Sequence, residues 1–232
     1  AQKTKKRVTG ILALVILLYI AAAVITKAYP NRIVEGLPII FGFIIDDLLP
    51  PNWGYYTSVL GRLLETWNIA LLSSTISAVV CLPLSFLAAA NINRNTYFYS
   101  AVRFGFNILR TIPDLVLAVI VVAIVGLGAL SGMLTLFIFS LGILAKLLSE
   151  TIEAIDPGPL EAIRATGGNV LQVIAYGAIP QILPHYASYS LFILEINVRA
   201  SVVLGFVGAG GIGMILKQQL ALFNYGNVAI II

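Results

Sequence analysis

Few residues in this chain are able to do chemistry, and two of them are charges inside an apolar stretch. Glu195 and Arg199 lie four positions apart within residues 182–207, so a helix places them on one face, where they are able to pair. Charges inside a membrane cost roughly a few kcal/mol, which marks these two either as functional residues or as an ion pair that orients helices. If an anion crosses the membrane here, Arg199 is able to offset its charge along the translocation path, and Glu195 would then hold Arg199 in place. Asn197 and Ser201 are then hydrogen-bond donors nearby.

Five glycines follow the charged pair at the end of the same apolar stretch. The segment from Gly208 to Gly213 fits the pattern GxGxxG, but it follows a membrane helix and not a first β-strand, so a dinucleotide site is rejected. No GxxxxGK[ST] pattern occurs, and the chain is therefore not expected to hydrolyse ATP itself. The glycines allow either close packing of backbones or local unwinding of a helix. They are Gly205, Gly208, Gly210, Gly211 and Gly213.

Other reactive side chains give weaker support to alternative functions. His185 is the only histidine, and its place at the edge of an apolar stretch is more typical of a surface residue than of a base or ligand, so no metal site is expected. An intramembrane hydrolase needs a polar nucleophile with a base, which one such histidine supplies poorly. An ion-coupled secondary transporter would use Glu195 and Asp114 as titrating groups, although no internal repeat supports it. Cys81 is the only cysteine, so no disulfide is predicted.

The composition sets these residues in a lipid environment. Hydrophobic residues make up 59% of the chain, charged residues only 10%, and the mean hydropathy is +0.99, which excludes an ordinary soluble domain. The formal charge of +4 is concentrated in the N-terminal tail and one loop. Contact with lipid headgroups explains that charge better than contact with nucleic acid.

Apolar stretches predict an all-α, polytopic membrane protein with six transmembrane helices. Residues 115–145 hold no charge but are too long for one crossing, so they predict a hairpin with its bend at 126–132 and a first arm that begins near Phe104. The other predicted spans are residues 8–26, residues 67–90 with Pro83 able to kink the helix, residues 182–207, and a last span that opens at Val228.

The distribution of basic residues predicts the orientation. Residues 1–7 carry four bases, and residues 91–110 carry Arg94, Arg103 and Arg110 without an acid. Because short segments rich in Lys and Arg stay on the cytoplasmic side, the N-terminus is expected in the cytoplasm. Six spans counted from there place the segment 150–184, between the fourth and fifth spans, in the cytoplasm as well. The first span also has the basic start of a secretory signal peptide, but its apolar core is longer than the roughly 15 residues that such peptides use.

The segment 150–184 is amphipathic and carries charge, and its first part predicts a short helix. The break at 156–159 supplies Gly158 as the N-cap and Pro159 as the first helical residue. Glu161 is then the third helical residue, near the positive end of the helix dipole. The helix is expected to stop near Gly167, which suits a left-handed cap.

A second helix is predicted directly after the first one. Asn169 can begin this helix, which is expected to run to Pro180. The two helices would form a helix-turn-helix elbow that faces a soluble partner. On periodicity alone, an ordinary cytoplasmic loop with one surface helix is the favoured interpretation.

The spacing within the elbow resembles the EAA loop of ABC importer permeases. That pattern is Glu-Ala-Ala, three residues, Gly, nine residues, Ile, one residue, Leu-Pro, and this chain has Glu161-Ala162 and Gly167 at the matching positions. Three positions depart by small or apolar exchanges: Ile163 stands for the second Ala, Gly177 for the Ile and Ile179 for the Leu. The resemblance implies that residues 156–167 form the coupling helix that docks on an ATP-hydrolysing subunit. The implied coupling residues are Asp156, Pro157, Glu161, Ala162, Arg164 and Gly167.

Two longer segments sharpen the resemblance. EAIDPGPLEAIRATGG and the later EINVRASVVLGFVGAGGIG look like the permeases of phosphonate and phosphite uptake systems, and methionine-type permeases share similar segments. The resemblance covers about residues 67–232 and implies a gate near the external mouth at Gly208, Gly210, Gly211 and Gly213. Tight packing alone would explain these glycines as well.

The same resemblance implies a set of partners and a location. It implies a homodimer in the bacterial inner membrane, two cytoplasmic subunits that bind ATP and Mg, and an external solute-binding protein, with no cofactor in this chain. Residues 67–232 would form the permease core, with the coupling loop at 150–184. Residues 1–66 would hold the basic tail, the first span and an external connection with room for an extra surface helix.

Overall fold

The computed structural model describes residues 2–27, 30–93 and 95–232, and the side chains of residues 2–6 and 30–33 also lie outside the description. The predicted positive charges at Lys3, Lys5, Lys6 and Arg94 therefore lie outside it as well. The described chain is helical without a strand. It divides into two compact units, Ala1–Pro51 and Asn52–Ile232, which are treated separately. The division expected at residue 66 falls inside a helix of the second unit.

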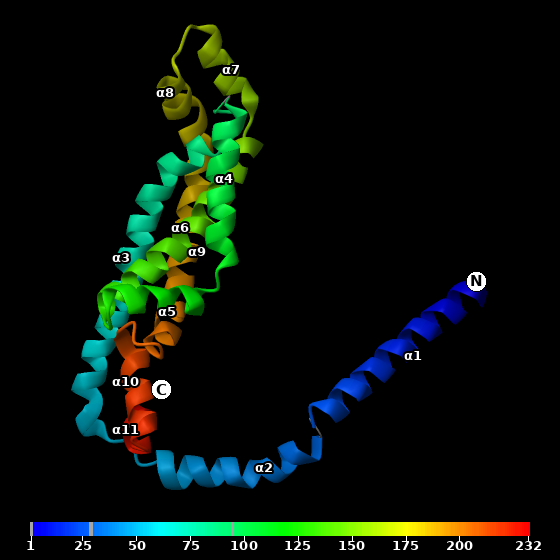
Figure 1. Ribbon diagram of the computed structural model, residues 1–232, viewed down its shortest axis with the longest axis vertical. Coiled ribbons are helices and arrows are strands. Elements are labelled where there is room, and N and C mark those ends of the chain that lie inside the picture. The colour runs from blue at the N-terminus through cyan, green and yellow to red at the C-terminus, as the bar shows by residue number, and fades with distance from the viewer. Residues whose placement is uncertain (1, 28–29, 94) are drawn as a thin grey trace. The chain divides into compact units, whose positions relative to one another are not determined.

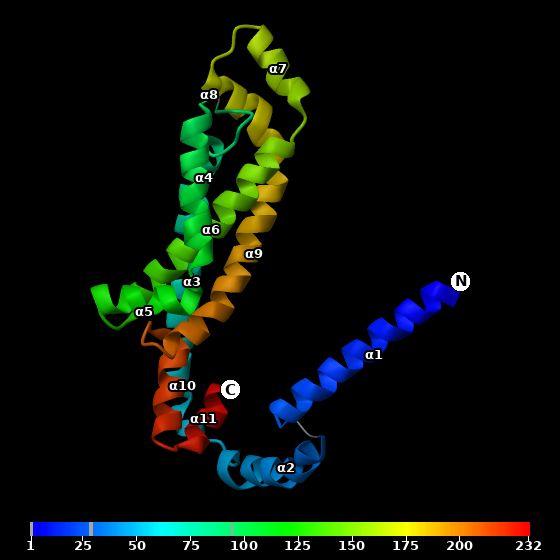
Figure 2. The ribbon, with the colours of Figure 1, turned by 45° about the vertical axis from the view of Figure 1, so that its right-hand side comes forward.

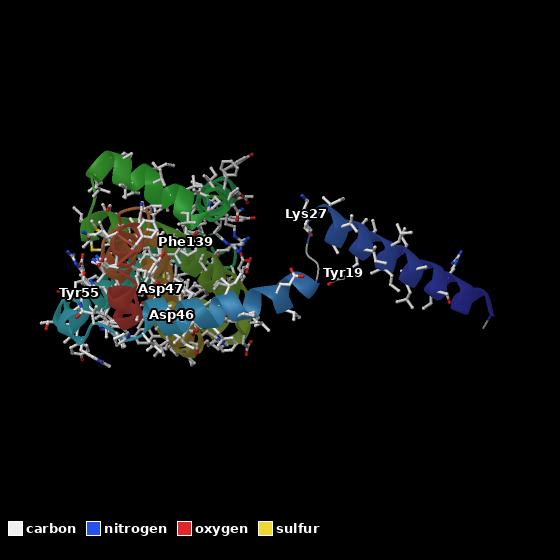
Figure 3. The ribbon with its side chains drawn as sticks, turned by 90° about the horizontal axis from the view of Figure 1, so that it is seen from below. Tyr19, Lys27, Asp46, Asp47, Tyr55 and Phe139 are labelled. Atoms are coloured by element: carbon white, nitrogen blue, oxygen red, sulfur yellow. The ribbon has the colours of Figure 1, made fainter. Side chains whose placement is uncertain are left out.

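The first unit contains one membrane-spanning helix and one shorter helix. α1 (Gln2–Ile25) includes an apolar span over Arg7–Ile25 in which no residue is buried, and its side chains stand out on every side (Figure 3). This span matches the prediction for residues 8–26. α2 (Pro30–Gly42) continues into a π-helical turn, Phe43–Leu48, within the segment that has room for an extra helix.

The second unit is a bundle in which three long helices, α3, α6 and α9, run side by side (Figures 1 and 2). The short helices α7 and α8 lie at one end of these three, and α10 and α11 lie toward the other end. The elements are η2 (Trp53–Tyr55), α3 (Tyr56–Leu87), α4 (Thr96–Thr111), α5 (Asp114–Val125), α6 (Ala129–Ala154), α7 (Pro157–Ala165), α8 (Val170–Gln172), η3 (Val173–Ala178), α9 (Ile179–Gly205), α10 (Gly211–Ala221) and α11 (Tyr225–Ile231).

Within the described residues four helices are long and apolar enough to cross a membrane, or five if the bent pair α4 and α5 is one span. These two helices meet at 93°, on either side of Ile112 and Pro113. The prediction of six spans is therefore not reproduced by this count. The predicted hairpin bend is present, because α5 ends at Val125 and α6 begins at Ala129, with Gly126 and Gly128 at positive φ.

Two boundaries differ from the prediction for reasons visible in the sequence. Residues 91–110 were expected as a loop, but α4 covers most of them, because Phe98, Val102 and Phe106 recur every four residues and form an apolar face between its charges. α3 begins at Tyr56 and not at residue 67. Its charged first part is stabilised by an ion pair between Arg62 and Glu65 at 2.6 Å.

Serine hydroxyls bring α3 and α6 together. Ser73, Ser77 and Ser85 are fully buried, and each donates a hydrogen bond across the interface. The acceptors are the carbonyl oxygens of Met133 at 3.1 Å, Phe137 at 3.0 Å and Ala145 at 3.2 Å. Small residues spaced by four allow two helix backbones to approach closely in a membrane. The serine spacing therefore allows α3 and α6 to pack closely along this interface.

Candidate functional site

The first helix of the elbow begins two residues earlier than the sequence suggested. Asp156 is the N-cap of α7: its backbone is extended, and its carboxylate accepts a hydrogen bond from Gly158 N at 2.9 Å. Pro157 is the first helical residue, where its missing N–H costs nothing. The prediction of Gly158 as the cap is wrong, because a carboxylate binds free helix amides and glycine cannot. Glu161 is thus the fifth helical residue and not the third.

The turn between the two elbow helices has the expected left-handed glycine. Gly167 has φ +85°, and the amides of Gly167 and Gly168 bind the carbonyls of Arg164 and Ile163 at 3.0 and 2.9 Å. This double closure is a Schellman motif. Asn169 then caps α8, with a reciprocal pair of bonds to Gln172 at 2.8 and 2.9 Å.

The second helix does not stop at Pro180. It passes through the π-helical turn η3 into α9, and Pro180 lies in the first turn of α9, where a proline fits. Gln181 ties this region to the start of the elbow. Its Oε1 accepts from Asp156 N at 3.1 Å, and its Nε2 donates to Gly177 O at 2.8 Å. Sequence reasoning missed Gln181 because its partner on the elbow is distant in the chain.

Two departures from the EAA pattern compensate for each other. A Cβ on Gly177 would lie 3.5 Å from Leu160 Cα and 3.3 Å from Ile163 Cδ1. Leu160 is buried against η3. The larger side chain at Ile163 therefore fills the space that the smaller residue at 177 leaves.

The outer face of α7 is free for a partner. Glu161 and Ala162 are exposed, and Glu161 has no hydrogen bond or ion pair within the part of the chain that the structure describes. Arg164 is exposed as well, but its Nη2 donates to Asn91 O at 3.0 Å. A groove of ≈ 930 Å³ lies between α8 and the α3–α4 connection, with Arg164, Asn169 and Leu171 among its lining residues.

The predicted pair in α9 forms. Arg199 Nη2 lies 2.7 Å from Glu195 Oε1, and the side chains are 70% and 66% exposed in the single chain. Asn197 is fully buried on the other side of the helix, and Ser201 is buried and donates to Val198 O at 2.9 Å. The structure thus brings Glu195 and Arg199 together but does not bring Asn197 and Ser201 to them.

The glycines form a turn between α9 and α10. α9 ends at Gly205 and α10 begins at Gly211, with positive φ at Gly208, Gly210 and Gly211. A Cβ on Gly213 would collide with the carbonyl of Val202, so both predicted uses of glycine occur here.

The glycine turn is held by two residues that sequence reasoning missed. Gly128 N donates to Gly208 O at 2.9 Å, and Ile212 N donates to Thr66 Oγ1 at 2.8 Å. The turn therefore contacts both α3 and the α5–α6 connection. No local signal identifies Thr66, because its partner is 146 positions away. Among the described residues, no group of three His, Cys, Asp or Glu side chains is placed to hold a metal ion.

The helical bundle and its long apolar helices define the class as an all-helical, polytopic membrane protein. Residues 81–232 match the family described as binding-protein-dependent transport system inner membrane component, and the chain belongs to that family.

Relatives and solved structures agree with this assignment. The phosphite transport system permease protein PtxC of Stutzerimonas stutzeri is 36% identical over 202 residues, which cover 87% of this chain and 73% of that protein. The phosphate-import permease protein PhnE of Mycolicibacterium smegmatis is 34% identical over 92% of this chain, which spans 41% of that longer protein. An inward-facing structure of the MetNI methionine ABC transporter matches with a TM-score of 0.68 at 26% identity, covering 78% of this chain and 89% of that one.

Proposed function

We propose that this chain is the transmembrane permease of an ATP-driven importer for phosphonate- or phosphite-type anions. The observation that carries the proposal is the elbow, where α7 presents an exposed Glu161 that has no ion pair among the described residues. The helix is fixed at both ends by Asp156 and Gly167. The similarity to a phosphite permease and to a phosphate-import permease supports the substrate class, because phosphite and phosphate are both tetrahedral oxyanions.

The partners follow from the family and from the exposed faces. Two cytoplasmic subunits bind ATP and Mg, and each docks on one elbow through Ala162, Arg164 and their neighbours. A second copy of the chain completes the path, and an external binding protein delivers the anion. The N-terminus and the elbow lie in the cytoplasm, which the positive residues of the tail and of α4 support.

The path runs along the face of α9 that carries Glu195 and Arg199. An exposed ion pair on a membrane helix is costly in lipid, so it faces either water or a partner subunit. Arg199 offsets the charge of the anion while Glu195 positions the guanidinium. Asn197 contributes from the buried side by fixing the rotation of α9 through its bonds to Ser140 and Ser74. Ser201 donates within α9 and lies on the same buried side.

The glycine turn is the gate of this mechanism. ATP binding closes the ATPase subunits and moves the elbows, and the path then opens outward to receive the anion. Gly208, Gly210, Gly211 and Gly213 supply a backbone that changes conformation without side-chain clashes, next to the fixed points Thr66 and Gly128.

The decisive experiment purifies a tagged chain from its native membrane and identifies the accompanying proteins by mass spectrometry. An ATPase subunit is expected with the unaltered chain and is expected to be lost when Glu161→Arg is combined with Gly167→Trp. Glu35→Arg is the matched charge reversal at an exposed position in the first unit, and it should retain the subunit. If no ATPase accompanies the unaltered chain, the proposal fails at its central point.

Uptake assays separate the alternatives. Phosphite or phosphonate uptake that requires ATP supports the proposal, whereas ATP-dependent methionine uptake would favour the permease type that the solved structure represents. Uptake that persists without ATP and is sensitive to a protonophore would favour an ion-coupled transporter that uses Glu195 and Arg199.

A further inference from the structure

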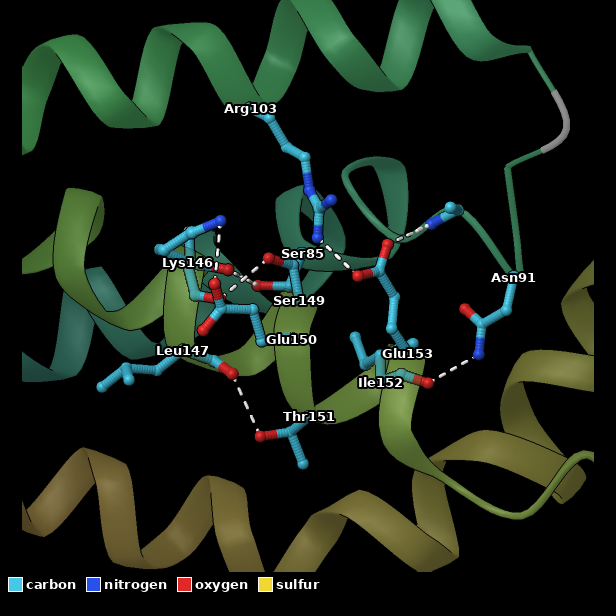
Figure 4. A network of polar contacts seen from close by, with 12 residues as sticks. Ser85, Asn91, Arg103, Lys146, Leu147, Ser149, Glu150, Thr151, Ile152 and Glu153 are labelled. Carbon is cyan, nitrogen blue, oxygen red and sulfur yellow. Dashed lines mark hydrogen bonds and ion pairs between the residues drawn. The ribbon is translucent and has the colours of Figure 1, made fainter.

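A carboxylate at the end of α6 joins three segments of the bundle. Glu153 lies in the last turn of α6, and its Oε2 lies 2.6 Å from Arg103 Nη2 of α4 (Figure 4). Its Oε1 accepts a hydrogen bond from Ala90 N, in the connection between α3 and α4, at 2.8 Å. One side chain of α6 thus binds both α4 and the connection that leads into α4.

The position of Glu153 is unfavourable for α6 alone. A carboxylate in the last turn meets the negative end of the helix dipole, and no basic residue lies in that turn to offset it. Arg103 and the Ala90 amide supply the offset from outside the helix. The side chains of Arg103 and Glu153 are 24% and 27% exposed, so the pair is screened less than a surface pair. The position of Glu153 is therefore explained by its contacts with Arg103 and Ala90, and not by stabilisation of α6 itself.

Asn91 extends the same junction to the elbow. Its Nδ2 donates to the carbonyl oxygen of Ile152 at 2.6 Å, one of the free carbonyls at the end of α6 (Figure 4). Its own carbonyl accepts from Arg164 of α7 at 3.0 Å. The connection at residues 90 and 91 is consequently fastened to α6 and to the coupling helix together.

The junction also holds unused hydrogen-bonding capacity. Asn91 Oδ1 and Arg103 Nε are buried and have no partner among the described residues, one being an acceptor and the other a donor. Buried polar atoms without partners are rare in folded proteins and need an explanation. A second arrangement of the junction, in which each of these two atoms gains a hydrogen-bond partner, would explain why they are unpaired in this one.

We propose that Arg103 and Glu153 are positioning residues that make α4 follow the movement of the elbow. The inference rests on the proposed function, because it needs ATP to move the elbow. Glu153 lies three residues before Asp156, the N-cap of α7, so displacement of the elbow acts on it directly. α4 leads into α5, and Gly128 just beyond α5 binds Gly208 of the glycine turn. A continuous series of contacts thus links the elbow to the glycine turn.

The test measures nucleotide-driven movement in the assembled complex with paired spin labels, after Cys81→Ala removes the native cysteine. Cysteines at exposed positions 97 and 79 report α4 against α3, and cysteines at exposed positions 175 and 79 report the elbow against α3. In the unaltered junction, trapping with ATP and vanadate should change both distances. In Glu153→Gln or Arg103→Gln, the elbow distance should still change and the α4 distance should not.

Two further variants keep the result decisive. The reversed pair Arg103→Glu with Glu153→Arg should recover most of the α4 response, even if a single variant fails to assemble. Glu150→Gln, one turn earlier on α6 and paired with Lys146 at 2.8 Å, is the matched control and should respond normally. Phosphite transported per ATP should fall about tenfold in the single variants, within the usual range of coupling effects.

The outcomes separate this inference from the proposed function. If the elbow distance does not respond to nucleotide in the unaltered junction, the proposed function fails. If the elbow responds but α4 does not, or if α4 responds equally in the single variants, Arg103 and Glu153 do not transmit the movement. A reversed pair that assembles without any α4 response also overturns the inference.

Discussion

Asn197 of α9 donates a hydrogen bond to Ser74 Oγ of α3 across 2.9 Å, and both residues are buried where three helices meet. The carbonyl oxygen of the same amide accepts from Ser140 of α6 at 2.9 Å. One side chain therefore bonds α9 to both of its long neighbours. This arrangement fixes the rotation of α9 and turns Glu195 and Arg199 to the opposite face.

Replacing Asn197 by leucine should destabilise the bundle although the volume is nearly kept. Ser140 would be left with a buried hydroxyl and no partner, which costs about 1–3 kcal/mol. Ser74 would lose less, since it also donates to Ala70 O at 2.7 Å. Thermal unfolding of the purified protein in detergent measures the effect. Ser201→Ala is the control, because among the described residues that hydroxyl bonds only within its own helix. Equal losses in the two variants would contradict the role of Asn197.

The packing of the elbow predicts that a substitution at one position departing from the EAA pattern is compensated by a substitution at another. Gly177→Ile should weaken ATPase binding, because its side chain would meet Leu160 and Ile163 and push α7 away from η3. Overpacking of this kind costs about 1–3 kcal/mol. Adding Ile163→Ala should restore most of the binding by removing the obstructing methyl groups. Co-purification of the ATPase subunit measures both steps, and an unrescued double variant would contradict the compensation.

Local relationships could be predicted from the sequence, and distant ones could not. The pair Glu195 and Arg199 was predicted from spacing alone, and the Gly167 turn was predicted from the residue type. The bond between Asn197 and Ser74 joins residues 123 positions apart, so only the packed bundle reveals it. Such distant pairings also hid the roles of Glu153 and Thr66.

The predicted boundaries of helices were wrong where two local signals in the sequence competed. Both Asp156 and Gly158 are acceptable N-caps, and the backbone conformation decides in favour of Asp156. The arginines of residues 91–110 indicated a loop, whereas the apolar residues between them formed α4 once α6 was present to cover them. Sequence reasoning therefore gave the membrane class and the elbow, but not the exact spans.

Two glycine substitutions should act in opposite directions. In Gly213→Ala the new methyl group would collide with the carbonyl of Val202, where α10 crosses the end of α9, so misfolding or loss of assembly is expected. Gly61 lies in α3 with open space around it, and Gly61→Ala should stabilise the helix by about 0.5–1 kcal/mol. Expression level and thermal unfolding measure both effects. A well-folded Gly213→Ala variant would show that the turn tolerates separation of the two helices.

The ion pair of α9 distinguishes a translocation path from a purely orienting role. If Arg199 offsets the anion, Arg199→Gln should lower phosphite uptake about tenfold or more, in line with the loss of a charge-assisted hydrogen bond. ATPase binding should be unchanged, because the pair lies away from the elbow. The neutral double variant Glu195→Gln with Arg199→Gln should stay as poor as Arg199→Gln, since no cation remains for the anion. If the pair only orients helices, the double variant should recover, because neither charge is then left unpaired. Uptake into proteoliposomes, measured beside ATP hydrolysis, decides between the two roles.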